Sequence, residues 1–308
     1  MESEVKQRND SIKSCVKLVF LYILFVMGLS TIVEGAAPDA PKVGRIICAL
    51  LGTLYALKKS DCAPEKGTLL RDNQPMTAVT FVVVLGAFVL SKLLSLGPSA
   101  LLLKLFVNEE NAEALQGLSS VEENVLLSFL DLGIVTAFCE ETVFRGCVGR
   151  TFEKYGVRFA MLMSTLLFAL YHCNLFQLVS TFLPGLVLFY VASRYSIKWS
   201  MLLHFINNGL LSICFTGLKK VAPDAFFSNY GEYVVEALLI VAALCLVKKD
   251  NAGAKVKEFL NGPRDEEGVY KAAVGNRWFV LVVLAMALLS AALLFMLDGG
   301  MDVLPAAA

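Results

Sequence analysis

Long apolar stretches alternate with short polar segments along the whole chain. An uninterrupted apolar run of about 18 residues or more is typical of a helix that crosses a membrane. The pattern predicts about nine membrane-spanning helices, at Val16–Val33, Val43–Leu57, Met76–Leu96, Val125–Arg150, Phe159–Asn174, Phe176–Ala192, Trp199–Thr216, Tyr233–Val247 and Trp278–Leu297. We therefore predict an all-α, polytopic membrane protein.

Composition supports this prediction. Hydrophobic residues make up 57% of the 308 residues, whereas soluble domains contain about 45–50%. The 27 Lys and Arg residues balance the 27 Asp and Glu residues, so the charge gives no indication of nucleic-acid binding, and membrane lipid is the expected partner. The eight cysteines form no CxxC pair and lie mostly in apolar segments, where cysteine behaves as a small hydrophobic residue. We do not expect a disulfide scaffold.

The chain divides into three parts by the placement of its polar residues. Residues 1–124 hold the first spans and their loops, and residues 125–216 form a core of about four helices. Residues 217–308 hold further spans, with a polar segment at about 248–277 that we expect to be a cytoplasmic loop with at most one short helix.

Positive charge falls on alternate loops. Because cytoplasmic loops of membrane proteins carry an excess of Lys and Arg, this favours a cytoplasmic N-terminus, and in a prokaryote a place in the cell membrane. Lys42, Lys219 and Lys220 count against the scheme.

Ionisable residues occur inside the apolar runs of the core. The only two histidines, His172 and His204, lie there, as do Glu140, Glu141 and Arg145. Such residues are costly within a membrane, and by default they mark a functional site. The core is therefore the candidate site.

The spacing of these residues predicts that they lie at similar depth. The turn between two core helices contains Gly156, and Glu140 precedes it by 16 residues while His172 follows it by 16. In an antiparallel hairpin, residues equidistant from the turn are level with each other. His204 lies six residues beyond Lys198, or about 9 Å at 1.5 Å per residue, so we place the site in the cytoplasmic half of the membrane.

Helix faces separate the two neighbouring carboxylates. Glu141 and Arg145 have the i,i+4 spacing of an ion pair, whereas Glu140 points about 100° away and is left without a local partner. His204 and Asn208 share a face by the same i,i+4 spacing. We predict a site of four residues supported by the Glu141–Arg145 pair, namely Glu140, His172, His204 and Asn208.

A carboxylate and imidazoles in one pocket are suited to hydrolysis. Glu140 would take a proton from water, one histidine would orient the water or protonate the leaving amine, and Asn208, with His204, would hydrogen-bond the developing oxyanion. Alternatively, Glu140, His172 and His204 would bind zinc, whose catalytic sites use three protein ligands and a water. The HExxH signature of many zinc proteases is absent, so the sequence leaves the choice between zinc and no metal open.

Three motifs follow one another in the core. Glu140–Gly146 reads E-E-T-V-F-R-G, Phe168–His172 reads F-A-L-Y-H, and His204–Asn208 reads H-F-I-N-N. In this order and spacing they resemble the CAAX prenyl endopeptidase and bacteriocin-processing family (CPBP, or Abi) of intramembrane proteases. The resemblance covers about 125–215, under a third of the chain.

The resemblance implies endoproteolysis near a membrane-embedded peptide end that is apolar or prenylated. It assigns water activation to Glu140 and His172 and the oxyanion hole to His204 and Asn208. The family is commonly called metalloproteases, and its prokaryotic members are linked to bacteriocin self-immunity. Two alternatives remain open, a non-catalytic membrane partner or immunity protein that uses the same pocket, and a small transporter with a proton relay.

Overall fold

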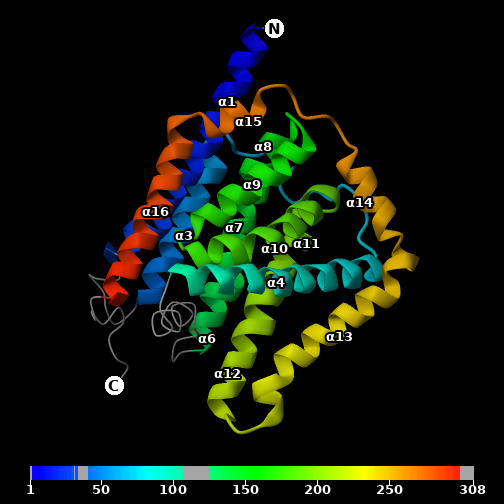
Figure 1. Ribbon diagram of the computed structural model, residues 1–308. Helices are drawn as coiled ribbons and strands as arrows, with labels where there is room; N and C mark the ends of the chain where they lie inside the picture. The colour runs from blue at the N-terminus through cyan, green and yellow to red at the C-terminus, as the bar shows by residue number, and fades with distance from the viewer. Residues whose placement is uncertain (1, 31, 34–40, 107–124, 299–308) are drawn as a thin grey trace.

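The structure is a computed structural model that describes residues 2–30, 32–33, 41–106 and 125–298, and every regular element in these ranges is a helix (Figure 1). The elements of the first half of the chain are α1 (Glu2–Ile23), η1 (Leu24–Leu29), α3 (Pro41–Lys58), α4 (Ala78–Phe106), α6 (Val125–Ser128), η2 (Phe129–Val135), α7 (Thr136–Glu140), η3 (Glu141–Gly149) and α8 (Arg150–Glu153). The remaining elements are α9 (Val157–Tyr171), α10 (Leu175–Arg194), α11 (Ile197–Phe205), η4 (Ile206–Ile213), α12 (Cys214–Val221), α13 (Phe226–Asp250), α14 (Ala252–Leu260), α15 (Val269–Val274) and α16 (Arg277–Asp298).

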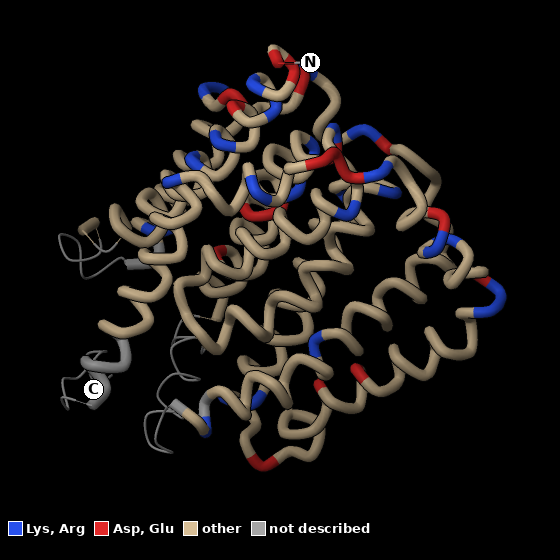
Figure 2. The backbone as a smooth tube through the Cα atoms, turned by 45° about the horizontal axis from the view of Figure 1, so that its top comes forward, with Lys and Arg blue, Asp and Glu red and all other residues tan. Residues whose placement is uncertain are grey.

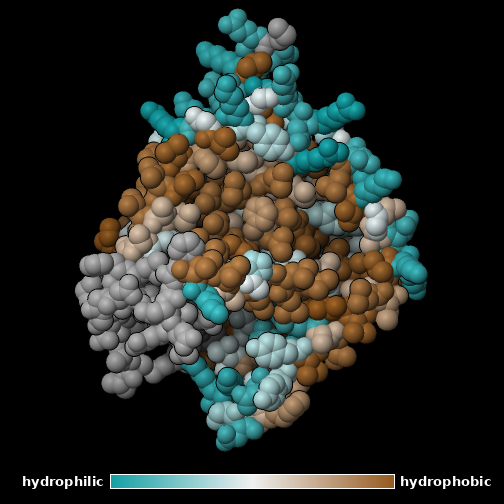
Figure 3. Space-filling model, in the orientation of Figure 1, coloured by the Kyte–Doolittle hydropathy of each residue, from teal (hydrophilic) through white to brown (hydrophobic). Residues whose placement is uncertain are grey.

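The predicted all-α membrane fold is confirmed, but the count of nine spans is not. Each predicted span overlaps a helix. Within the described ranges, five helices are long and apolar enough to cross a membrane, at Glu2–Leu29, Ala78–Leu102, Leu175–Arg194, Ile197–Val221 and Phe226–Asp250. Two shorter helices, at Val157–Tyr171 and Arg277–Ala292, are also apolar. A broad hydrophobic band crosses the surface in Figure 3, and most charged residues in Figure 2 lie toward the end that carries the N-terminus.

Two of the predicted spans in the core are composite helices. The elements from α6 to α8 follow one another without a break, as do α11, η4 and α12. In each, α-helical turns alternate with the π-helical stretches η2, η3 and η4. Such wide turns are rare and are frequent at functional sites. Of these stretches, η3 contains residues of the first motif and η4 contains residues of the third.

Short connections make α8, α9, α10 and α11 spatial neighbours. Gly156 turns the chain between α8 and α9 with a φ of 133°, a conformation open mainly to glycine. Asn174 caps α10 by accepting a hydrogen bond from the Phe176 amide at 2.9 Å, and Ser196 caps α11 by accepting one from Lys198. These turns bring the end of α9, with His172, close to α11, with His204.

The helix α4 connects the core to the C-terminal part. It packs against both α10 and α13 (Figure 1). Lys92 on α4 forms ion pairs with Glu232 at 3.1 Å and with the buried Glu236 at 2.6 Å, both on α13. The lysine thereby balances charge that would otherwise be costly inside the membrane.

The polar segment at about 248–277 contains two short helices, α14 and α15, where the sequence predicted at most one. It is also attached to the core, because the Asp265 carboxylate accepts hydrogen bonds from the Phe159 amide and the Tyr270 hydroxyl, both at 2.9 Å. The Asp265 carboxylate caps the start of α9, a contact that composition alone does not indicate.

Candidate active site

The carboxylate of Glu141 is the most completely bonded group in the core. Glu141 is fully buried at the start of η3. Its Oε1 lies 3.1 Å from Nη1 of Arg145 and 3.0 Å from Nδ1 of His204, and its Oε2 accepts a hydrogen bond from the Ser200 hydroxyl. The i,i+4 ion pair expected from the spacing is therefore present, together with two partners on α11. The three bonds hold Glu141 in one place.

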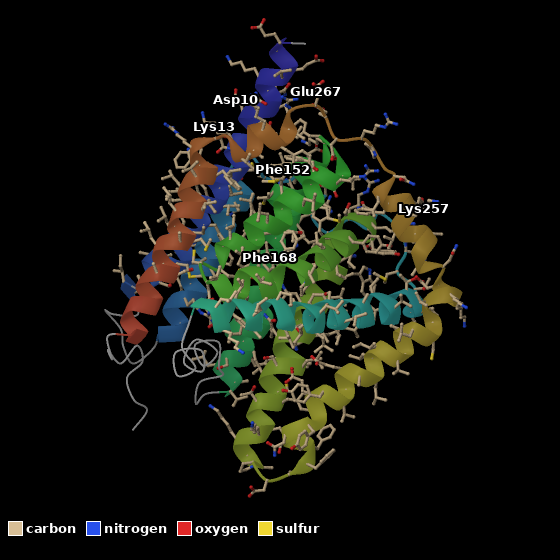
Figure 4. The ribbon with its side chains drawn as sticks, in the orientation of Figure 1. Asp10, Lys13, Phe152, Phe168, Lys257 and Glu267 are labelled. Carbon is tan, nitrogen blue, oxygen red and sulfur yellow. The ribbon has the colours of Figure 1, made fainter. Side chains whose placement is uncertain are left out.

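Arg145 is enclosed by three kinds of contact. Besides Glu141, its Nη2 donates to the Gly185 carbonyl on α10 at 3.3 Å. Its guanidinium carbon lies 4.1 Å from the centre of the Phe168 ring, a cation–π contact. Phe168, labelled in Figure 4, lies near the middle of the molecule on α9. The ion pair thus joins η3, α9, α10 and α11 into one unit.

Glu140 has a different environment, although it is the adjacent residue. It is 6% exposed, and its Oε2 lies 3.8 Å from Nε2 of His204, beyond hydrogen-bond distance. It also lies within electrostatic range of His172 and Tyr171. Glu141 and Glu140 therefore face opposite nitrogens of His204, one in a hydrogen bond and the other across a short gap.

The orientation of both histidines is defined by their Nδ1 atoms. Nδ1 of His172 lies 2.9 Å from the Phe168 carbonyl, which can only accept, so this nitrogen carries a proton and Nε2 is left free. Nδ1 of His204 donates to the Glu141 carboxylate in the same way. The ring of Phe168 stands edge-on to both imidazoles, at 4.9 Å from His172 and 6.2 Å from His204. Both Nε2 atoms are therefore available for chemistry.

Asn208 lies one turn beyond His204, in η4. Its amide nitrogen donates to the Leu132 carbonyl in η2 at 3.2 Å, and its oxygen accepts from Asn207 at 2.8 Å. The two π-helical stretches approach closely because Gly133 faces Gly209, and a Cβ on Gly133 would lie 3.1 Å from the Gly209 Cα. Since an amide nitrogen has two hydrogens, one hydrogen of Asn208 remains after the bond to Leu132.

Two parts of this arrangement escaped the sequence analysis. The first is the role of Ser200 and Glu141 in holding His204, for which the i,i+4 spacing of Ser200 and His204 was an unused signal. The second is an ion pair between Arg45 on α3 and the buried Asp131 on η2, in which Nε of Arg45 donates to Asp131 at 2.9 Å. Arg45 and Asp131 are 86 residues apart, so no local spacing indicates their contact.

The zinc alternative involves Glu140, His172 and His204. Across the described ranges, no three His, Cys, Asp or Glu side chains are placed to hold a metal ion. Of the set Glu140, His172 and His204, both histidines have Nδ1 engaged by protein oxygens. A hydrogen bond at Nδ1 leaves Nε2 free, as it also does in most histidines that bind a metal, so the choice between zinc and no metal stays open.

Comparison with known proteins agrees with the motifs. Residues 122–210 match a family model described as Rce1-like, type II CAAX prenyl endopeptidase Rce1-like. The match includes all three motifs and confirms the resemblance. No curated protein and no solved structure matches the chain.

Proposed function

We propose that this protein is a glutamate-dependent intramembrane endopeptidase, because residues 122–210 match the Rce1-like model of type II CAAX prenyl endopeptidases. Its substrate is a peptide whose C-terminal region is apolar or prenylated and so lies in the membrane. The observation that supports this most is the unequal bonding of the adjacent carboxylates, in which Glu141 is fully engaged and Glu140 is not.

In the proposed reaction, Glu140 accepts a proton from a water molecule while the water oxygen attacks the scissile carbonyl. His172 assists because its Nε2 is free to accept the second hydrogen of this water. The carbon–nitrogen bond then breaks, and the proton held by Glu140 passes to the leaving amine. The oxygen and one hydrogen of the water thus end in the new carboxyl group, and the other hydrogen ends in the new amino group.

His204 and Asn208 stabilise the oxyanion that forms when the water attacks the carbonyl, before the carbon–nitrogen bond breaks. Asn208 supplies its remaining amide hydrogen. His204 can donate from Nε2 only as an imidazolium, since Nδ1 already carries the hydrogen directed at Glu141. The Glu141 carboxylate holds the His204 ring in place through Nδ1, which gives the supporting ion pair a direct link to the chemistry.

The test is cleavage of a quenched fluorogenic peptide that ends in a farnesylated Cys-a-a-X sequence, with purified protein in detergent. Wild type should release the C-terminal fragment, and Glu140→Gln should lower kcat by about 10²-fold or more while the protein stays folded. Full activity of Glu140→Gln would refute the assigned role. If Glu140→Gln is inactive on peptide yet complements a deletion strain, the pocket serves binding rather than hydrolysis.

A further inference from the structure

Tyr22 on α1 has a buried hydroxyl group with no hydrogen-bond partner among the described residues. The side chain is 1% exposed. Buried polar groups in proteins are nearly always paired, and an unpaired one calls for an explanation. Tyr22 lies outside the segment that matches the protease family, so the family comparison assigns it nothing.

The packing of the Tyr22 ring does not explain the hydroxyl. The ring centre lies 5.4 Å from that of Tyr171 and 6.2 Å from that of Phe144. On the other side, α3 has Gly52, where a Cβ would lie 2.9 Å from the ring. A phenylalanine would make all these contacts without burying an unpaired oxygen, so the hydroxyl needs a different reason.

The position of the hydroxyl suggests that reason. Tyr171, against which Tyr22 packs, is adjacent to His172, and the Tyr171 and His172 rings are 5.4 Å apart. Tyr22 also lies within electrostatic range of Glu140. Its nearest polar neighbour on α3 is Thr53, whose own hydroxyl donates to the Ala49 carbonyl at 2.8 Å. Tyr22 is therefore separated from His172 by one aromatic ring, on the side of the site that α1 forms.

We propose that Tyr22 is a positioning residue of the hydrolytic site, and that its hydroxyl shares a water molecule with Glu140. This rests on the proposed function. A buried water commonly bridges polar groups that have no direct partner. One hydrogen of the water is directed at Glu140 and the other at Nε2 of His172. The Tyr22 hydroxyl donates to one lone pair of the water, so that the other lone pair points at the substrate carbonyl. Tyr22 then acts on the attacking water and not on substrate binding.

Tyr22→Phe removes only the oxygen and tests this directly. With the farnesylated fluorogenic peptide, kcat should fall about tenfold or more, since misplacement by about 1 Å can cost as much as 10²-fold. KM should stay within about twofold, and the melting temperature should not fall, because the variant loses no direct hydrogen bond to another described residue. A structural role would instead lower the melting temperature together with the activity.

Tyr195→Phe is the matched control. Tyr195 is also buried and its hydroxyl also has no hydrogen-bond partner within the described part of the chain, but it lies between α10 and α11 beside Tyr190. Its kcat should equal that of wild type. A wild-type kcat for Tyr22→Phe, or an equal loss in both variants, overturns the inference.

The same assay separates this inference from the function on which it rests. If Glu140→Gln is inactive and Tyr22→Phe is fully active, only the role of Tyr22 is wrong. If Glu140→Gln is as active as wild type, or wild type does not cleave the peptide, the proposed function fails and the inference fails with it.

Discussion

The two adjacent glutamates should differ sharply in their effect on stability. Glu141→Gln and Glu140→Gln make the same chemical change one residue apart, in side chains that are both nearly inaccessible to solvent. In Glu141→Gln, Arg145 loses its ion pair with this carboxylate and keeps the Gly185 carbonyl and the Phe168 ring. In Glu140→Gln, no contact within hydrogen-bond distance is lost among the described residues, because the carboxylate lies 3.8 Å from His204.

The magnitudes follow from these contacts. Breaking a buried ion pair by removing one partner costs about 3–5 kcal/mol. A contact beyond hydrogen-bond distance contributes less than the net of about 1 kcal/mol typical of a hydrogen bond. The two variants should therefore differ by about 2–4 kcal/mol. At about 2–4 °C per kcal/mol, Glu141→Gln should melt at least about 4 °C below Glu140→Gln.

The assay is thermal unfolding of wild type and both variants in one detergent, followed by fluorescence-detected size exclusion. A double variant gives a second comparison. Glu141→Gln combined with Arg145→Met also removes the guanidinium charge that has lost its partner, and it should recover part of the stability that Glu141→Gln loses. If Glu140→Gln melts as low as Glu141→Gln or lower, the structural and catalytic carboxylates have been assigned the wrong way round.

Two further variants test other parts of the structure. Lys92→Met should lower the melting temperature, since it leaves the buried Glu236 carboxylate without its ion pair at a cost of about 3 kcal/mol or more. The kcat of the protein that remains folded should equal that of wild type, and a loss of kcat at unchanged stability would contradict this. Gly133→Ala should lower kcat, because its Cβ would lie 3.1 Å from the Gly209 Cα, a backbone atom that cannot rotate away, and the resulting shift would weaken the hydrogen bond of Asn208 to η2. Steady-state kinetics that showed an unchanged kcat would mean that this close approach is not needed.

The sequence predicted the helices and the local pairing well because both depend on short-range patterns. Apolar runs indicate where a chain can cross a membrane, and the i,i+4 spacing places Glu141 beside Arg145, as the structure has them. The same spacing separates Glu140 from that pair. The catalytic roles of Glu140 and the histidines stay predictions, since geometry alone does not measure them.

The π-helical stretches could not be predicted from the same patterns. Turns of π-helix and α-helix place apolar residues on nearly the same face over one or two turns, so hydrophobicity does not distinguish them. In η4 the wider turn carries Asn208 to the Leu132 carbonyl. Long-range contacts such as that between Arg45 and Asp131 could not be predicted either, because a single sequence does not indicate which distant residues are in contact.

These long-range contacts show that the matched segment does not form the site alone. Residues 122–210 contain the three motifs, but α1 and α3 lie outside them and supply Tyr22 and Arg45. Asp131 is 2% exposed, so a fragment without α3 would lose the Arg45 partner of a buried carboxylate, and a fragment without α1 would uncover the Phe144 ring against which Tyr22 packs. The charged groups of the proposed site and the aromatic side chains packed beside them therefore come from different parts of the chain, and we expect variants in α1 and α3 to affect the chemistry as well as variants in the motifs.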